Sequence, residues 1–227
     1  MRSADGVLTG AVFDLDGTLV DNIRFHFEAF RALAGRLGLV MDAATFQSFN
    51  GLKNEDIFPR FLGRPLARSE SDALADEKES TYRTLYRPEL VAHRGAEALL
   101  ARLRAAGVKL AVASSAPPAN RSMVIDGLGW GASFDAVVAS EGLRGKPAPD
   151  VFLAAAERLG VAPTDCVAFE DAVNGIQAAA AAGMLVVGVT TNVTAVELTA
   201  AGARFTIADF TTLPGELEAL LPRADLP

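Results

Sequence analysis

The sequence predicts an α/β protein in which a mainly parallel sheet carries helices on both faces. Two observations predict this fold class. Short apolar runs alternate with helical patterns along the C-terminal two-thirds of the chain, as in β-α-β units. Residues 22–90 interrupt the alternation with helical patterns alone. We therefore expect a Rossmann-like core formed by residues 1–21 and 91–227, and a helical cap domain formed by residues 22–90 and inserted after the first strand.

Six apolar segments are expected to form the strands, because each is short and is followed by polar residues or a turn. They are residues 7–13, 110–113, 137–139, 166–169, 185–189 and 204–208. The carboxyl ends of parallel strands lie at one edge of a sheet, where ligands bind in folds of this class. Asp14, Ser114 and Asp171 lie at three of these ends. We therefore expect them to meet at one edge.

Helices are expected where apolar residues recur with the helical period. In the core these segments are residues 96–103, 149–159 and 174–182, and Gly107 and Gly160 follow the first two. In the insertion one apolar stripe includes Phe30 and Leu33, and a second includes Leu74 and Tyr82. Such an insertion can close over the sheet edge as a lid. The alternative is that it only adds a helical layer.

Composition limits the partners of this chain. Its net charge of −7 argues against nucleic acid, which requires a basic face. Its longest apolar stretch, residues 178–189, is shorter than the ~20 residues that span a bilayer, so no membrane association is expected. The single cysteine, Cys166, excludes an internal disulfide and fits the reducing cytoplasm. The sequence leaves the oligomeric state open and is compatible with a monomer.

Four acidic residues are expected near the sheet edge: Asp14, Asp16, Glu170 and Asp171. They cannot all stay ionised close together without a counter-charge. A hard divalent cation with oxygen ligands supplies that charge, and Mg²⁺ suits a site with few carboxylates and a substrate phosphate. The chain has no cluster of histidines and cysteines of the zinc type. With the metal in place, one carboxylate can attack phosphorus and the other can transfer protons.

A phosphoryl group also needs donors for its outer oxygens. Ser114 offers a hydroxyl and a neighbouring backbone N–H at a strand end, and Lys146 offers a cation in a proline-stiffened loop. Taken singly, Ser114 is a turn serine and Lys146 a surface lysine. Their expected position at the acidic edge favours the phosphate-binding interpretation. Ser115, next to Ser114, is a further candidate for substrate contact.

Together these segments resemble the haloacid-dehalogenase-like hydrolase superfamily. Residues 14–18, Ser114, residues 145–147 and the pair Glu170 and Asp171 occur in the order and approximate spacing of its four motifs, and residues 169–179 are similar to the last motif. The insertion is similar to the helical cap of the subgroup that contains phosphoglycolate phosphatases and beta-phosphoglucomutases. The resemblance covers nearly the whole chain.

The resemblance implies a role for each motif residue. Asp14 is the implied nucleophile and Asp16 the implied general acid/base, while Ser114 and Lys146 hold the phosphoryl group. Asp14, Asp171 and the backbone carbonyl of Asp16 are the implied Mg²⁺ ligands, with Glu170 as a ligand or beside one. Dehalogenases of the superfamily lack the second acid and need no metal. Asp16 and Asp171 therefore indicate phosphoryl transfer.

The cap resembles that of the beta-phosphoglucomutases at His26, which in those enzymes helps to control the acid/base aspartate. The loop of residues 50–56 is also mutase-like, but Asn54, with Lys53 beside it, stands where the mutases place an arginine that binds the distal phosphate. Lys78 is a candidate on the cap's underside. We expect a phosphatase that hydrolyses a small phosphorylated metabolite, such as a sugar phosphate; the alternative is a sugar phosphate mutase.

A different class of function uses a phosphorylated aspartate as a switch without turnover, as receiver domains do. Receiver domains share an acidic cluster, a hydroxyl residue and a lysine, but they are about half this length and have no cap. A degenerate family member that only binds a ligand is a second non-enzymatic alternative. The intact set of Asp14, Asp16, Ser114, Lys146 and Asp171 favours the enzyme.

Overall fold

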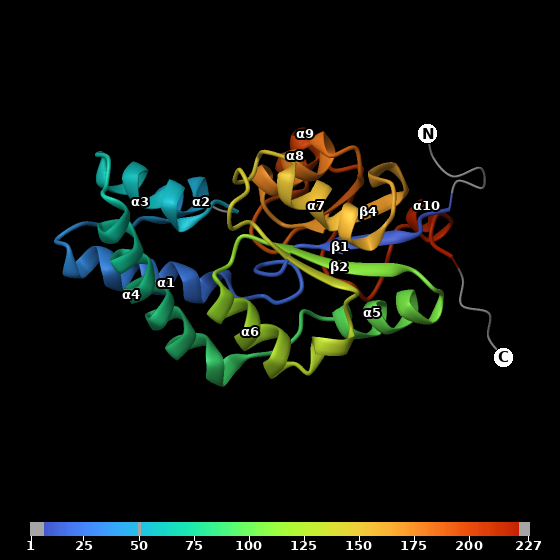
Figure 1. The fold of residues 1–227 in the computed structure, drawn as a ribbon, viewed down its shortest axis with the longest axis horizontal. Coiled ribbons are helices and arrows are strands. Elements are labelled where there is room, and N and C mark those ends of the chain that lie inside the picture. Colours follow the sequence, from blue (N-terminus) through green and yellow to red (C-terminus); the bar gives the residue numbers. More distant parts are fainter. Residues whose placement is uncertain (1–6, 50, 223–227) are drawn as a thin grey trace.

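The computed structural model describes residues 7–49 and 51–222. Six parallel strands form one sheet in the order β3-β2-β1-β4-β5-β6 (Figure 1). All six expected strands are present, although the first begins three residues later than expected. The strands are β1 (Gly10–Phe13), β2 (Lys109–Ser114), β3 (Ala136–Ala139), β4 (Cys166–Glu170), β5 (Leu185–Val189) and β6 (Phe205–Ile207).

Helices cover both faces of the sheet, which confirms the predicted fold class (Figure 1). Alternate strand residues face opposite sides: Phe13, Val112 and Phe169 join one buried cluster, and Val12 and Ala168 join the other. The first face packs against α5 (Ala96–Ala105), α6 (Pro118–Gly127) and α10 (Gly215–Glu218), and the second against α7 (Asp150–Leu159), α8 (Val173–Ala181) and α9 (Ala195–Ala201).

Three of these core helices, α6, α9 and α10, were not expected from the sequence, and the first two carry local signals. Helix α6 has Pro118 in its first turn, where a missing N–H costs nothing. Helix α9 begins with a capping box between Thr194 and Glu197. Both helices are short, and their apolar residues do not form a clear stripe with the helical period. In the described residues, no helix has the length and apolar character needed to span a membrane.

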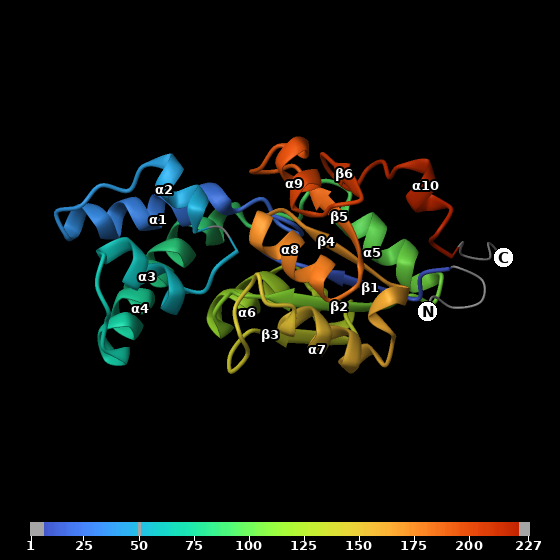
Figure 2. The same cartoon turned by 90° about the horizontal axis from the view of Figure 1, so that it is seen from above.

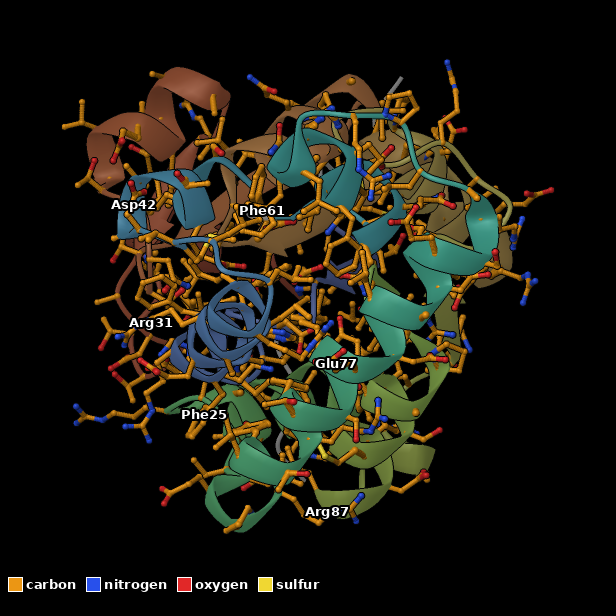
Figure 3. All side chains as sticks on the ribbon, turned by 90° about the vertical axis from the view of Figure 1, so that its left-hand side faces the viewer. Phe25, Arg31, Asp42, Phe61, Glu77 and Arg87 are labelled. Carbon is orange, nitrogen blue, oxygen red and sulfur yellow. The ribbon has the colours of Figure 1, made fainter. Side chains whose placement is uncertain are left out.

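Among the described residues of 23–89, the only regular secondary structure is helical, as expected for the insertion. Their bounds are α1 (Ile23–Arg36), α2 (Ala43–Ser48), α3 (Asn54–Leu62), α4 (Arg68–Tyr86) and the short 3₁₀ helix η1 (Arg87–Glu89). These helices extend from one end of the sheet (Figure 2) and surround an apolar cluster of their own that includes Phe30, Phe58 and Leu74. Figure 3 views this end directly, with Arg31 on α1 and Glu77 on α4.

The topological switch point of the sheet lies between β1 and β4. The chain proceeds from β1 to β2 and β3 on one side, then returns to place β4 on the other side of β1. Phe13 stacks on Phe169 with ring centroids 4.8 Å apart, which holds the ends of β1 and β4 in register. Ligands bind at such a switch point because the loops leave in opposite directions and open a crevice. Asp14 and Glu170 stand at this point.

Candidate active site

Three buried carboxylates meet where β1 and β4 end. Asp14 follows β1, Glu170 is the last residue of β4, and Asp171 follows it. One oxygen from each carboxylate lies within 4.8 Å of the others. The apolar strands bring these acids together because the register of β1 with β4 leaves them at the same sheet edge. This arrangement agrees with the expected acidic cluster for these three residues.

Lys146 reaches this cluster from the loop before α7. Its Nζ donates to Asp14 Oδ1 at 2.6 Å and to Glu170 Oε1 at 2.7 Å, and the side chain is 1% exposed. Burial lowers the pKa of Lys146, but the charges of the two carboxylates outweigh burial and raise it, so the side chain stays charged. The other oxygen of Glu170 accepts the N–H groups of Asp171 and Ala172 at 2.6 and 2.9 Å. Glu170 therefore holds both Lys146 and the turn that carries Asp171.

The carboxylates outnumber the cation that neutralises them. Burial raises the pKa of Asp14 to about 8, with Lys146 opposing the shift and Glu170 adding to it. Burial and the charges of Glu170 and Asp14 also raise the pKa of Asp171 well above its usual value. Without a further positive charge, the ionised forms of Asp14 and Asp171 are therefore unfavourable. Three carboxylates that a single lysine does not fully neutralise are a set of hard oxygen donors that suits Mg²⁺.

Asp171 is held from both sides by residues that the sequence did not single out. It accepts from the Thr18 hydroxyl at 3.0 Å and from the Asn192 amide at 3.1 Å. Gly17 passes directly beside its carboxylate with φ +84°, and any side chain at position 17 would overlap it. Gly17 and Thr18 belong to the first motif, so their closeness to the acids in the sequence could have predicted these contacts. Asn192 lies outside the four motifs, and nothing in the sequence predicted its contact with Asp171.

Asp16 is not part of the three-carboxylate group, although it lines the same cavity. Strand β1 ends at Phe13, and Asp16 lies in the turn that follows, where it forms an isolated bridge with Val20. The Asp16 carboxylate accepts from the Asn22 amide and lies 3.8 Å from His26 Nε2. Burial raises the pKa of Asp16, but the His26 ring and the Asn22 amide together lower it below its usual value.

His26 lies between Asp16 and the cap lysine Lys78. Lys78 Nζ lies 2.8 Å from His26 Nδ1, and because an ammonium can only donate, Nδ1 accepts and the neutral ring carries its hydrogen on Nε2. Nε2 is buried, has no hydrogen-bond partner among the described residues and faces Asp16. The ring stacks on Tyr82 at 3.8 Å, which fixes its orientation. The structure thus links Lys78 through His26 to Asp16.

A cavity of about 90 Å³ lies between the sheet edge and the cap. At ~15 Å³ per water, it has room for roughly six ordered waters, the scale of a small molecule. Ser114 Oγ accepts the Ala116 N–H at 3.0 Å, while Ser115 Oγ donates to the carbonyl of Gly51 in the cap at 3.3 Å. The expected site residues that line the cavity are Asp14, Asp16, His26, Asn54, Lys78, Ser114, Ser115, Glu170 and Asp171.

Lys53, expected as a substrate contact, does not line this cavity. Its Nζ donates to the carbonyl of Leu143 and lies 3.3 Å from Glu55. It precedes α3 as the N-cap residue, while Asn54 begins the helix, and the helical turn sends their side chains in different directions. The structure therefore places Asn54, and not Lys53, beside the ligand space.

These features define a class of protein: an α/β fold with an acidic site at the switch point of its sheet, beneath a layer of helices. The model of the haloacid dehalogenase-like hydrolase family matches residues 8–183, and the chain belongs to this family. The resemblance inferred from the four motifs is confirmed.

Relatives include two curated bacterial enzymes. The chain is 36% identical to the fructose-1-phosphate phosphatase YqaB of Escherichia coli over 176 residues, which cover 77% of this chain and 93% of the relative. It is 33% identical to the beta-phosphoglucomutase of Bacillus subtilis over 195 residues, with 80% and 83% covered. Among solved structures, beta-phosphoglucomutase (pgmB) from Clostridium difficile matches with a TM-score of 0.83 and 27% identity over 94% of this chain and 96% of that one.

The position of Gly175 in α8 leads to a prediction about this site. A methyl group there would overlap the Glu170 carboxylate, so Gly175→Ala must displace the group that holds Lys146 and Asp171. Displacements of about 1 Å at reacting groups cost ~10²-fold in rate. We expect phosphate release by Gly175→Ala to fall by about that factor.

Gly35→Ala is the matched control for Gly175→Ala. Gly35 also lies in a helix, but its position is exposed and nothing lies within 4 Å of an added methyl group. Alanine there should raise the free energy of unfolding by about 0.5–1 kcal/mol and leave the rate unchanged. Wild-type rates in Gly175→Ala would contradict the close contact with Glu170.

Proposed function

We propose that this protein is a Mg²⁺-dependent phosphatase that hydrolyses a small phosphorylated metabolite through an aspartyl-phosphate intermediate. The observation that carries the proposal is the buried cluster of Asp14, Glu170 and Asp171 with Lys146. The 36% identical fructose-1-phosphate phosphatase supports a sugar phosphate or a similar phosphomonoester as the substrate. The cavity between sheet and cap supports a substrate of small size.

In the first step, an Asp14 carboxylate oxygen attacks phosphorus, and the bond from phosphorus to the ester oxygen breaks. Asp16 gives a proton to the departing alcohol. In the second step, Asp16 takes a proton from water as the water attacks the same phosphorus, and the bond from phosphorus to Asp14 breaks. Inorganic phosphate leaves, and both aspartates return to their starting states. Lys146 and the Ser114 hydroxyl stabilise the charge on the outer phosphoryl oxygens.

Asp14, Asp171 and the backbone carbonyl of Asp16 are the residues that would hold Mg²⁺, with Glu170 beside them. When bound, Mg²⁺ supplies the positive charge that the acidic cluster lacks and withdraws charge from the phosphoryl oxygens. Residues 22–90 act as a cap that closes the site and limits the entry of bulk water. The cytoplasmic location suggested by the single cysteine and the monomeric state remain predictions.

Metal removal tests the cation requirement. Chelator should reduce phosphate release by at least ~10²-fold, and added Mg²⁺ should restore it, because charge repulsion in the acidic cluster opposes substrate binding without a cation. A second readout does not depend on activity. Mg²⁺ at about 100 times its Kd should stabilise the folded protein by about 3 kcal/mol, and Asp171→Asn should reduce this gain. Full activity in chelator would overturn the metal requirement.

The main test of the function is phosphate release from a panel of sugar phosphates, phosphoglycolate, glycerol phosphates and nucleotides. Metal-dependent release from one class of compound would support the phosphatase. Conversion of beta-glucose 1-phosphate to the 6-phosphate without net release would favour the mutase instead, which the Bacillus subtilis relative represents. A phosphorylated protein that turns over none of these compounds would favour the aspartate switch.

A further inference from the structure

Helix α4 buries two charged residues in the middle of its apolar face. Leu74, Tyr82 and Tyr86 are the other buried residues of this helix, and between them Lys78 and Glu79 are only 3% and 4% exposed. Burying a charge is costly, and a buried ion pair stabilises a fold no better than apolar residues of the same size. In the proposed mechanism, neither Lys78 nor Glu79 acts on the phosphoryl group. This pair therefore requires an explanation other than stability.

The Glu79 carboxylate accepts hydrogen bonds from several side chains on the cap side of the cavity. Its Oε1 accepts from the Asn54 amide at 2.8 Å and from Lys78 Nζ at 2.9 Å. Its Oε2 accepts from the Asn120 amide of α6 at 2.7 Å, and Arg83 in turn donates to the Asn120 carbonyl oxygen at 2.9 Å. Residues of α3, α4 and α6 thus converge on one carboxylate. Their donor groups are occupied before any ligand arrives.

No cation is left free at this end of the cavity. Of the described residues that line the cavity, Lys78 is the only lysine or arginine, and its charge is paired with Glu79. Lys53 is turned towards Leu143 and does not line the cavity, and Lys146 is paired at the opposite, sheet end. The remaining cap surface facing the cavity is apolar and includes Phe30, Phe46, Phe49, Leu52 and Ile57.

We propose that Glu79 is a specificity-determining residue that excludes substrates with a second anionic group. The inference rests on the proposed function, and it narrows the substrate to a compound with one phosphate and an uncharged, hydroxyl-bearing remainder. Hydroxyls of that remainder pair with the Asn54 carbonyl oxygen and the Glu79 carboxylate, and its C–H faces pack on Phe30 and Phe49. A carboxylate or second phosphate would meet the Glu79 carboxylate, and Lys78, the one lysine or arginine among the described lining residues, is already paired with that carboxylate and is not free to bind a further anion.

The charge of Glu79 is present at any working pH. Burial raises its pKa, but the Lys78 charge, the His26 ring and the Asn54 amide outweigh burial and lower it to about 2. The groups that act on Glu79 come from four elements: Lys78 on α4, Asn54 on α3, Asn120 on α6 and His26 on α1. The only positive charge among them is that of Lys78, and Glu79 already neutralises it.

The test compares two substrates that differ only at the non-reacting end. Fructose 1-phosphate and fructose 1,6-bisphosphate form such a pair, as do glucose 1-phosphate and glucose 1,6-bisphosphate. For the wild-type protein we expect kcat/KM to favour the monophosphate by about 10- to 100-fold, the effect of one poorly screened charge at cavity distances. Glu79→Gln should reduce this preference to about threefold or less.

Asn120→Ala is the matched control, because it removes a partner of Glu79 from the same cluster and keeps the carboxylate. A purely structural role for the cluster would lower both rates equally in either variant. The preference should therefore fall in Glu79→Gln and persist in Asn120→Ala. An unchanged preference in Glu79→Gln, or equal use of both compounds by the wild-type protein, would overturn the inference.

Binding separates this inference from the proposed function. Calorimetry with Asp14→Asn and Mg²⁺ gives the Kd of each compound without turnover, and we expect the same preference for the monophosphates. If no phosphorylated compound is hydrolysed, the proposed phosphatase fails, and the ratio of the two Kd values still decides the role of Glu79. Equal or tighter binding of the bisphosphates would overturn that role.

Discussion

Replacing Asp14 by Asn is expected to abolish turnover and leave the fold intact. An amide nitrogen cannot attack phosphorus, and loss of a nucleophile costs ~10⁴-fold or more in rate. Asparagine has the same shape, and Lys146 keeps its ion pair with Glu170 at 2.7 Å. Because burial raises the pKa of Asp14 to about 8, its charged form is unfavourable in the metal-free protein, and the neutral amide should not lower the melting temperature. Phosphate release and thermal unfolding measure the two effects.

Asp21→Asn is the matched control for Asp14→Asn. Asp21 is an exposed acid seven residues further along the chain, and it does not line the cavity. Its replacement should change neither the rate nor the melting temperature. Acid-quenched wild-type protein should carry phosphate on Asp14, and Asp14→Asn should carry none. Wild-type turnover in Asp14→Asn, or phosphate on another residue, would overturn its role as the nucleophile.

The strands and the acidic cluster could be predicted because the same physical feature defines both. A parallel strand buried on both faces is a short apolar run, and it ends where polar residues begin. Asp14 and Glu170 stand at two such ends, and the crossover rules place those ends side by side. Phe13 pairs with Phe169 in the sheet, so the residues that follow them, Asp14 and Glu170, lie next to each other.

The cap residues could not be placed from the sequence, because their burial depends on partners from other elements. Helix α4 is rich in charged residues, and Lys78 and Glu79 are indistinguishable in the sequence from the exposed Glu77 beside them. In the structure Asn54 and Asn120 converge on Glu79, and Lys78 lies against His26 of another helix.

Replacing Asp16 by Ala is expected to slow both chemical steps by ~10²–10⁴-fold, the usual loss when a general acid or base is removed. Its lowered pKa keeps Asp16 ionised in the ligand-free protein, which suits the base that activates water. The acid step needs a proton on the same oxygen. A bound phosphate monoester brings negative charge that raises the pKa of a neighbouring carboxyl. Substrate binding therefore loads the proton that Asp16 then gives to the leaving alcohol.

Two substrates with different leaving groups separate these steps. An alkyl phosphate leaves as a basic alkoxide unless it is protonated, whereas p-nitrophenyl phosphate leaves as a stable phenolate that needs no proton. Asp16→Ala should therefore form the phosphoenzyme rapidly from p-nitrophenyl phosphate, with a burst of phenolate, and then hydrolyse it slowly. With the alkyl phosphate both steps should be slow. Equal losses for both substrates without a burst would mean that Asp16 acts by shaping the site with Asn22, and transfers no proton.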